Sequence, residues 1–293
     1  MVYEYLLLFL LFVIFIIFIS LIIYYIIYYS FDNTNANSNI YYMSADETSA
    51  FLKEDNDYYI SGLSAYDLYA RDTSSTIKYL ADIQTLATSF TDKDVELLNN
   101  CTSIADDLLR NIKSYNINDI AYAKFINFKE IANIKWVFSK TESGGKLSYE
   151  SGLPHTRKNI IFLSDKVLIN DEDELIKVLI HEKIHIYQRN NSDLFKSIII
   201  NMGYIEVTDD MIANNSELIR QIKYRRSNPD INKKLYKNTA TNKILICFYK
   251  SDKPSSISDV SGNYYDEHPY EKIAYELSEY IYKKNKIEKY KNI

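Results

Sequence analysis

His181, Glu182 and His185 carry the clearest chemical signal in this sequence, because they form the pattern His-Glu-x-x-His. Residues four apart on a helix lie on the same face, so the imidazoles of His181 and His185 can bind one metal ion. Glu182 lies beside them and can take a proton from a metal-bound water. Zinc suits these donors, since it lowers the pKa of a bound water to roughly 7. We therefore predict a zinc site that activates water for hydrolysis.

A catalytic zinc ion needs a third protein ligand if one position is to stay open for water. The next candidate segment begins at Asp266, and Pro269 suits the first turn of a helix there. Glu271 lies in that first turn, and Glu276 borders the other side of the apolar stripe, so helical geometry alone does not separate the two. We favour Glu271, because an early-turn carboxylate can lean over a neighbouring helix.

Short apolar runs indicate the strands that would support this motif. Residues 134–138 and 159–163 read as strands, and 143–145 reads as a turn that leads to a further short strand at 146–149. Residues 244–249 predict one more strand after the motif. Because helical stretches alternate with these strands, we expect an α+β fold.

Two helices are well marked by their starting residues. The acidic run 170–174 predicts the start of a helix that continues to about residue 189 and carries the motif. Thr91 is a plausible N-cap for a second helix, whose apolar stripe follows helical spacing. Cys101 falls inside that stripe, so we expect a packed thiol and not a reactive one.

Over residues 133–285 the sequence resembles the HExxH metallopeptidases with a glutamate as third ligand, the gluzincin-type zincins. It is also similar to predicted metallopeptidase-like proteins encoded by large DNA viruses. The likeness rests on four segments: Leu153–Thr156, the motif extended through Ile184–Arg189, Ser227–Asp230, and His268–Ala274.

This resemblance implies a zincin-like catalytic domain, in which a small sheet and an active-site helix are followed by a helical lobe. It also implies zinc on His181, His185 and Glu271, with Glu182 as general base. The spacing departs from that of the best-known gluzincins, because Glu271 follows His185 by 86 positions. A sizeable insertion must therefore fold between the two ligands.

The N-terminal residues predict attachment to a membrane. From Leu6 to Ile23 every residue is apolar except Ser20, and the run is longer than the apolar core of a cleaved signal peptide. We therefore assign residues 1–30 to a transmembrane anchor. We then expect a linker at 31–47, a helical region at 48–118 and the zincin-like metallopeptidase domain at 119–293.

Composition excludes two other classes of protein. The net charge is −5 and no basic stripe is present, which argues against a nucleic-acid partner. The two cysteines, Cys101 and Cys247, allow at most one internal disulfide, so this is not a disulfide-stabilised scaffold.

Several polar residues near the motif have two readings. His155 could donate a hydrogen bond to an oxyanion, but we favour a loop histidine bonded to the backbone. For His268 we favour a helix cap over a residue that orients a ligand. Asn228 and Asp230 could bind substrate, but the sequence Asn-Pro-Asp is typical of a turn, which we favour.

The first expectation for function is a membrane-anchored zinc-dependent metallopeptidase, in which water activated by Glu182 hydrolyses a peptide or protein substrate. The substrate would bind in an extended form beside the strand at 159–163. An alternative is a catalytically silent zincin-like structural or entry protein, anchored in a virion membrane. A third is an interaction module in which the motif is accidental.

Overall fold

The structure is a computed structural model that describes residues 39–112, 120–143, 148–169, 171–262 and 267–291. The predicted transmembrane anchor at 1–30 and the linker up to residue 38 lie outside these ranges. Among the described residues, no helix is long and apolar enough to cross a membrane. Ile40–Ile293 forms one compact unit of mixed α+β architecture.

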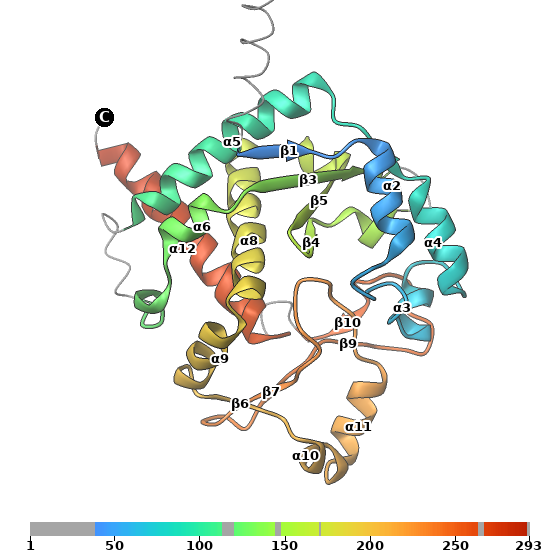
Figure 1. Ribbon diagram of the computed structural model, residues 1–293. Helices are drawn as coiled ribbons and strands as arrows, with labels where there is room; N and C mark the ends of the chain where they lie inside the picture. Colours follow the sequence, from blue (N-terminus) through green and yellow to red (C-terminus); the bar gives the residue numbers. More distant parts are fainter. Residues whose placement is uncertain (1–38, 113–119, 144–147, 170, 263–266, 292–293) are drawn as a thin grey trace, which may run out of the picture. The chain divides into compact units, whose positions relative to one another are not determined.

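The centre of this unit is a five-stranded sheet in the described part of the chain (Figure 1). β3 pairs in parallel with β1 and β5, β2 pairs with β3 in antiparallel fashion, and β4 pairs with β5 in antiparallel fashion at the edge. The strands are β1 (Ile40–Tyr42), β2 (Ala87–Thr88), β3 (Trp136–Thr141), β4 (His155–Arg157) and β5 (Ile160–Ser164).

Both faces of β5 are buried, because its side chains alternate between two hydrophobic clusters. Ile161 and Leu163 pack with helices on one face, while Ile160 and Phe162 pack with helices on the other. The first face is covered by α5 (Asp92–Arg110), α6 (Phe128–Asn133), α8 (Glu172–Asn190) and α12 (Pro269–Lys291). The second is covered by α2 (Ala45–Glu54), α3 (Ala65–Ala70) and α4 (Thr76–Gln84).

The helix α8 carries the His-Glu-x-x-His motif and forms where the sequence predicts it. Asp171 caps its first turn by accepting a hydrogen bond from Asp173 N, and acidic residues of that turn complement the positive end of the helix dipole. Leu175, Leu179 and Ile184 are fully buried against the core. Figure 1 shows α8 in yellow running between the sheet and the red helix α12, against which it packs.

Between α8 and α12 the chain forms a lobe that contains small sheets as well as helices. One sheet has the strand order β6-β7-β8, and the other pairs β9 with β10. The elements are α9 (Ser192–Asn201), β6 (Tyr204–Glu206), α10 (Asp209–Ala213), α11 (Ser216–Lys223), β7 (Tyr236–Asn238), β8 (Ile244–Leu245), β9 (Phe248–Tyr249) and β10 (Val260–Ser261). The described residues also form the short helices η3 (Ala123–Phe125), η4 (Tyr149–Gly152) and α7 (Asp165–Leu168).

Several sequence predictions are confirmed. Thr91 caps α5 in a capping box with Asp94. Cys101 is buried within that helix, and burial raises the pKa of its thiol to about 11. The strands expected at 134–138 and 159–163 are present as β3 and β5, with ends shifted by one to three residues.

Other predictions are wrong, and in each case long-range pairing is the reason. The linker expected at 31–47 includes β1, which pairs with β3, and the start of α2, which Ser44 caps. The helical region expected at 48–118 is not a separate unit, because β2 pairs with the central sheet and α5 packs on α8. The lobe after α8, expected to be helical, contains the two small sheets.

Two strand predictions after β3 are also corrected. The strand expected at 244–249 is split into β8 and β9, since the chain passes there from one small sheet to the other. The strand expected at 146–149 is not formed at Ser148 and Tyr149, where η4 begins instead. Residues 144–147, with most of the expected turn, lie outside the described ranges.

Lys183, within the motif, is part of the core and not of the chemistry. Its Nζ donates to Asp106 Oδ1 of α5 at 2.6 Å and to the Ala132 carbonyl of α6 at 3.0 Å, and lies 3.9 Å from the centroid of the Trp136 ring. Burial lowers the pKa of Lys183 to about 8, against the pull of Asp106. The buried ammonium therefore joins α8 to two helices and to β3.

Replacing Lys183 by Ala should lower the free energy of unfolding by about 3 kcal/mol or more, because Asp106 then keeps a buried charge without its main partner. The double variant Lys183→Met/Asp106→Asn should lose less, since both charges are removed together. Urea unfolding of the full chain, followed by the fluorescence of the single tryptophan, Trp136, measures both. Lys166→Ala, at an exposed position, is the control and should change the free energy by less than about 0.5 kcal/mol.

The pH dependence of the free energy of unfolding is a second test of the Lys183–Asp106 ion pair. The pKa of Lys183 is about 8 in the folded chain and lies below its ordinary value of 10.5. Between these two pH values, Lys183 is therefore protonated in the unfolded chain but largely deprotonated in the folded one. The stability of the wild type should therefore rise with pH relative to that of the double variant. A double variant no more stable than Lys183→Ala, or a parallel pH profile, would contradict this role.

Candidate metal centre

The two motif histidines lie one turn apart on α8 and direct their Nε2 atoms at each other. The two nitrogens are 3.0 Å apart, and the rings are nearly perpendicular, with their centroids 4.6 Å apart. Two neutral imidazoles with converging Nε2 atoms offer lone pairs to a shared cation. This arrangement follows directly from the spacing of four on a helix.

Glu271, in the first turn of α12, completes a cluster with the two histidines. Its Oε2 lies 3.4 Å from His181 Nε2 and 3.5 Å from His185 Nε2. Ligand atoms at 2.0–2.1 Å from a tetrahedral zinc ion would be about 3.3 Å apart. The spacing and donor types of His181, His185 and Glu271 therefore fit a zinc ion, and these are the residues that group as possible metal ligands in the described part of the chain.

Glu276, the other candidate for the third ligand, is held elsewhere. Its Oε2 accepts a hydrogen bond from Tyr122 Oη at 2.6 Å, and its Oε1 pairs with Lys272 Nζ at 2.9 Å. The structure thus places Glu271, and not Glu276, beside the histidines.

Neighbouring amides orient two of the three candidate ligands. Gln188 Oε1 lies 2.8 Å from His185 Nδ1, and Gln188 Nε2 donates to the Tyr270 carbonyl at 2.9 Å. The proton of His185 is therefore on Nδ1, and Nε2 keeps a free lone pair. Asn228 Nδ2 donates to Glu271 Oε1 at 2.7 Å, which leaves Oε2 toward the histidines.

His181 is held by packing. Its ring lies 4.4 Å, centroid to centroid, from the ring of Tyr275 on α12, and its buried Nδ1 has no hydrogen-bond partner among the described residues. Burial lowers the pKa of His181, which favours the neutral form that can bind a metal.

Glu182 lies beside the cluster with a buried carboxylate whose Oε2 has no hydrogen-bond partner in the described part of the chain. Burial raises its pKa well above the ordinary value, and the carboxylates of Asp230 and Glu271 raise it further. The group therefore has a stronger affinity for a proton than an exposed glutamate has. Burial alone would also raise the pKa of Glu271, but interactions with His185 and His181 hold it well below its usual range.

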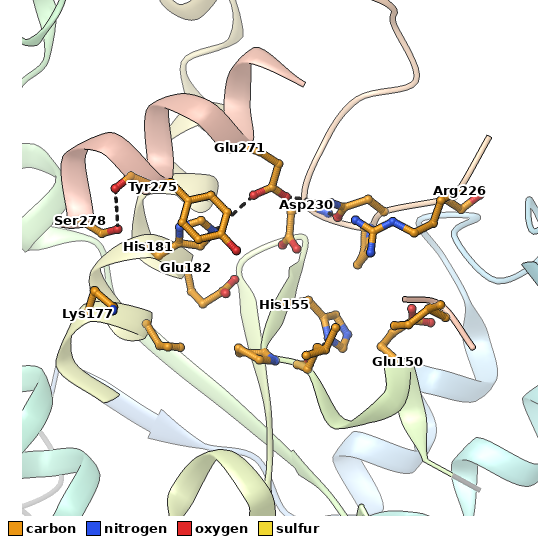
Figure 2. Close-up of a pocket in the computed structure, with 17 residues that line it drawn as sticks. Glu150, His155, Lys177, His181, Glu182, Arg226, Asp230, Glu271, Tyr275 and Ser278 are labelled. Carbon is orange, nitrogen blue, oxygen red and sulfur yellow. Dashed lines mark hydrogen bonds and ion pairs between the residues drawn. The ribbon is translucent and has the colours of Figure 1, made fainter. Parts of the chain in front are cut away.

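These residues open into one pocket (Figure 2). One wall is α8, with Lys177, His181 and Glu182, and another is α12, with Glu271, Tyr275 and Ser278. The other walls come from residues 153–155, at the start of β4, from residues 226–230, and from Glu150 and Ile257. Figure 2 shows Asp230 between Glu271 and His155.

His155 is bonded to the backbone, as the sequence analysis favoured, and it also lines the pocket. Its Nδ1 bonds to the Leu153 carbonyl at 3.0 Å. Because a carbonyl only accepts, Nδ1 carries the proton. Burial lowers the pKa of His155, so the neutral ring presents Nε2 as an acceptor, and it does not suit the donor role toward an oxyanion.

His268 caps α12, as the sequence favoured. Its Nδ1 accepts a hydrogen bond from Tyr270 N at 3.0 Å, and its Nε2 lies 3.1 Å from Asn232 Oδ1. Burial lowers the pKa of His268 to about 3, which keeps the ring neutral and suits the acceptor role.

Sequence analysis favoured a turn over a role in the site for Asn228 and Asp230, and the structure shows that residues 227–230 have both. Asn228 Oδ1 does accept from Asp230 N at 2.9 Å, which is the expected turn. The same segment also holds Glu271 through Asn228 and contacts β4 through Asp230, whose Oδ1 accepts from Thr156 N at 2.6 Å. These contacts with Glu271 and β4 had no local signal in the sequence, because they join segments 40 or more residues apart. Gln188, by contrast, could have been found, because it lies three residues after His185 on the same helix face.

The predicted place for a substrate is corrected by the sheet order. β5 lies between β3 and β4, so both of its edges are already paired and no peptide can add beside residues 159–163. The edge that borders the pocket belongs to β4.

Comparisons with protein-family models, with curated proteins and with solved structures found no match to this chain.

Proposed function

We propose that this chain is a zinc-dependent metallopeptidase that hydrolyses peptide bonds. The observation that carries the proposal is the convergence of His181 Nε2, His185 Nε2 and Glu271 Oε2 within 3.5 Å of one another, in a pocket that Glu182 also lines. Two imidazoles and one carboxylate are a typical ligand set for a catalytic zinc ion with one open position. We further propose that the apolar run at the N-terminus anchors the enzyme in a membrane.

The chain's own residues supply the proton transfers. When bound, zinc lowers the pKa of water and polarises a carbonyl. Glu182 accepts the proton of the attacking water at its carboxylate and returns it to the nitrogen of the leaving amine. One water is consumed, its hydroxyl joining the carbonyl carbon as the carbon–nitrogen bond breaks. The raised pKa of Glu182 suits a group that must hold this proton between the two steps.

The metal is tested first, by elemental analysis of the purified full chain. We expect about one zinc per chain, lost in both His181→Ala and Glu271→Ala, because each variant leaves only two ligands. Glu276→Ala is the matched control, since its side chain is bonded to Tyr122 and Lys272. Zinc retained in Glu271→Ala but lost in Glu276→Ala would contradict the ligand assignment, and a wild type without zinc would contradict the proposal.

The general base is tested by replacing Glu182 with Gln, which keeps the shape of the side chain but cannot take the proton. The variant should keep its zinc, while kcat for hydrolysis of a mixed peptide pool falls by about 10²-fold or more. Mass spectrometry of the products measures this rate. Wild-type activity in the variant would reject Glu182 as the base. A zinc-loaded wild type that cleaves nothing would favour a catalytically silent protein.

The side-chain amides of Asn228 and Gln188 should contribute more to zinc affinity than to the stability of the fold. Asn228→Ala and Gln188→Ala should each weaken zinc binding about 10- to 100-fold, because Glu271 and His185 lose the partners that aim them. Competition against a chromophoric chelator measures this change. Gln221→Ala removes an exposed amide bonded to Glu217 on α11 and should leave affinity unchanged. Equal affinity in all three variants would show that packing alone aims the ligands.

A further inference from the structure

An unsatisfied acceptor lies in the pocket at the start of β4. His155 is 3% exposed, and its Nε2 has no hydrogen-bond partner among the described residues. Its Nδ1 is committed to the Leu153 carbonyl, so Nε2 holds a lone pair. A buried acceptor of this kind is costly unless a ligand donates to it, and the lining of the pocket includes this residue.

A carboxylate that forms no ion pair among the described residues lies beside it, although Arg189 is close enough to interact with it electrostatically and is bonded to the same Thr156 hydroxyl. Asp230 accepts from Thr156 N and Thr156 Oγ1 with the same oxygen, Oδ1, at 2.6 and 2.7 Å. Within the described part of the chain it forms no ion pair, unlike the neighbouring pocket residues Glu150, which pairs with Arg71, and Arg226, which pairs with Glu267. Its second oxygen is therefore available to a cation in the pocket.

The edge of β4 is closed where Asp230 contacts it. Peptides that add to a sheet need the outward N–H and C=O groups of the edge strand. Pro154 has no N–H, the N–H of Thr156 is bonded to Asp230, and the carbonyl of Lys158 accepts from Arg189. An extended substrate therefore cannot continue along β4 past Pro154 while Asp230 is in place.

The segment that closes the edge is well anchored. Ser227 N and Ser227 Oγ donate to the two carboxylate oxygens of Asp67 on α3, each at 2.9 Å. Arg189 Nη2 donates to Thr156 Oγ1 at 3.0 Å and to the Pro229 carbonyl at 3.4 Å. The segment that closes the edge of β4 is thus held by hydrogen bonds on both sides of Asn228.

We propose that Asp230 and His155 form an amine-binding subsite that receives the free N-terminus of a short peptide. This inference rests on the proposed function and makes the chain an aminopeptidase. An α-ammonium carries one positive charge and three donors, and two of these donors match the carboxylate oxygen of Asp230 and the neutral imidazole nitrogen of His155. The N-terminal residue of a peptide also suits this position, because the edge of β4 is closed there and no earlier residue of the peptide has to pass Asp230.

The subsite is tested by binding, so that the result does not depend on hydrolysis. The full chain carrying Glu182→Gln is titrated calorimetrically with tetraalanine and with N-acetyl-tetraalanine. Tetraalanine should bind at least 10-fold more tightly. The preference should disappear in Asp230→Asn, which keeps an oxygen for Thr156 but loses the charge, and should shrink in His155→Phe. Asp210→Ala, an exposed acid on α10, is the control and should keep the preference.

Other outcomes would overturn the inference. Equal binding of the two peptides, or no measurable binding of tetraalanine, would reject the amine subsite. An N-acetylated tetrapeptide with lysine at its first position tests the other source of an ammonium group. If it bound as tightly as tetraalanine, the subsite would recognise a side chain and the aminopeptidase assignment would fail.

Hydrolysis by the full wild-type chain separates the two proposals. Cleavage of acetylated and free peptides at equal kcat/KM would contradict the subsite and leave the metallopeptidase in place. Selective binding of tetraalanine by a zinc-loaded chain that hydrolyses no peptide would contradict the metallopeptidase and leave the subsite in place.

Discussion

The contact between α8 and α12 is the interaction on which the rest of the candidate site depends. It brings a carboxylate within 3.5 Å of two histidines that precede it by 86 and 90 residues. The contact is possible because α12 offers a fully buried apolar stripe in which Ala274 lies one turn after Glu271 and permits a close approach. The bond from Gln188 to the Tyr270 carbonyl then ties the end of α8 to the start of α12. A shift of one helix along the other would separate the three candidate ligand atoms while leaving both helices intact.

Buried charges hold the wall of the pocket that faces these helices. Glu150 and Ser151 have positive φ values of 46° and 56°, a conformation that ordinary side chains rarely adopt. Arg71 holds Glu150 through a hydrogen bond of 2.9 Å from Nε to Oε1, and Arg157 on β4 pairs with Asp55 at 2.7 Å. Such buried pairs add little net stability compared with apolar packing, but they favour one arrangement over others. Here that arrangement places Leu153, Pro154 and His155 at the pocket.

The parts of the site that were predictable from the sequence are those with a local signal. The spacing of His181 and His185, the cap at Asp171 and the apolar run of β5 each depend on residues a few positions apart, and each is present. β1 was not predictable, because three residues are too few for an alternating pattern and only pairing with β3 defines it. The same limit applies to Lys183, whose role depends on Asp106, 77 residues earlier, and to Asp230, whose partner Thr156 lies 74 residues earlier.

The insertion between the candidate ligands is therefore part of the site and not only a spacer. From one short stretch, Ser227 bonds to α3, Asn228 to the candidate ligand Glu271, and Asp230 to the edge of β4. The bond from Asp230 N to Asn228 Oδ1 joins the last two contacts within a single turn. A displacement that opened the edge of β4 would consequently also release the oxygen of Glu271 that Asn228 holds. The position of the candidate ligand Glu271 and the edge of β4 are thus coupled through residues 227–230, which lie in the long segment between α8 and α12.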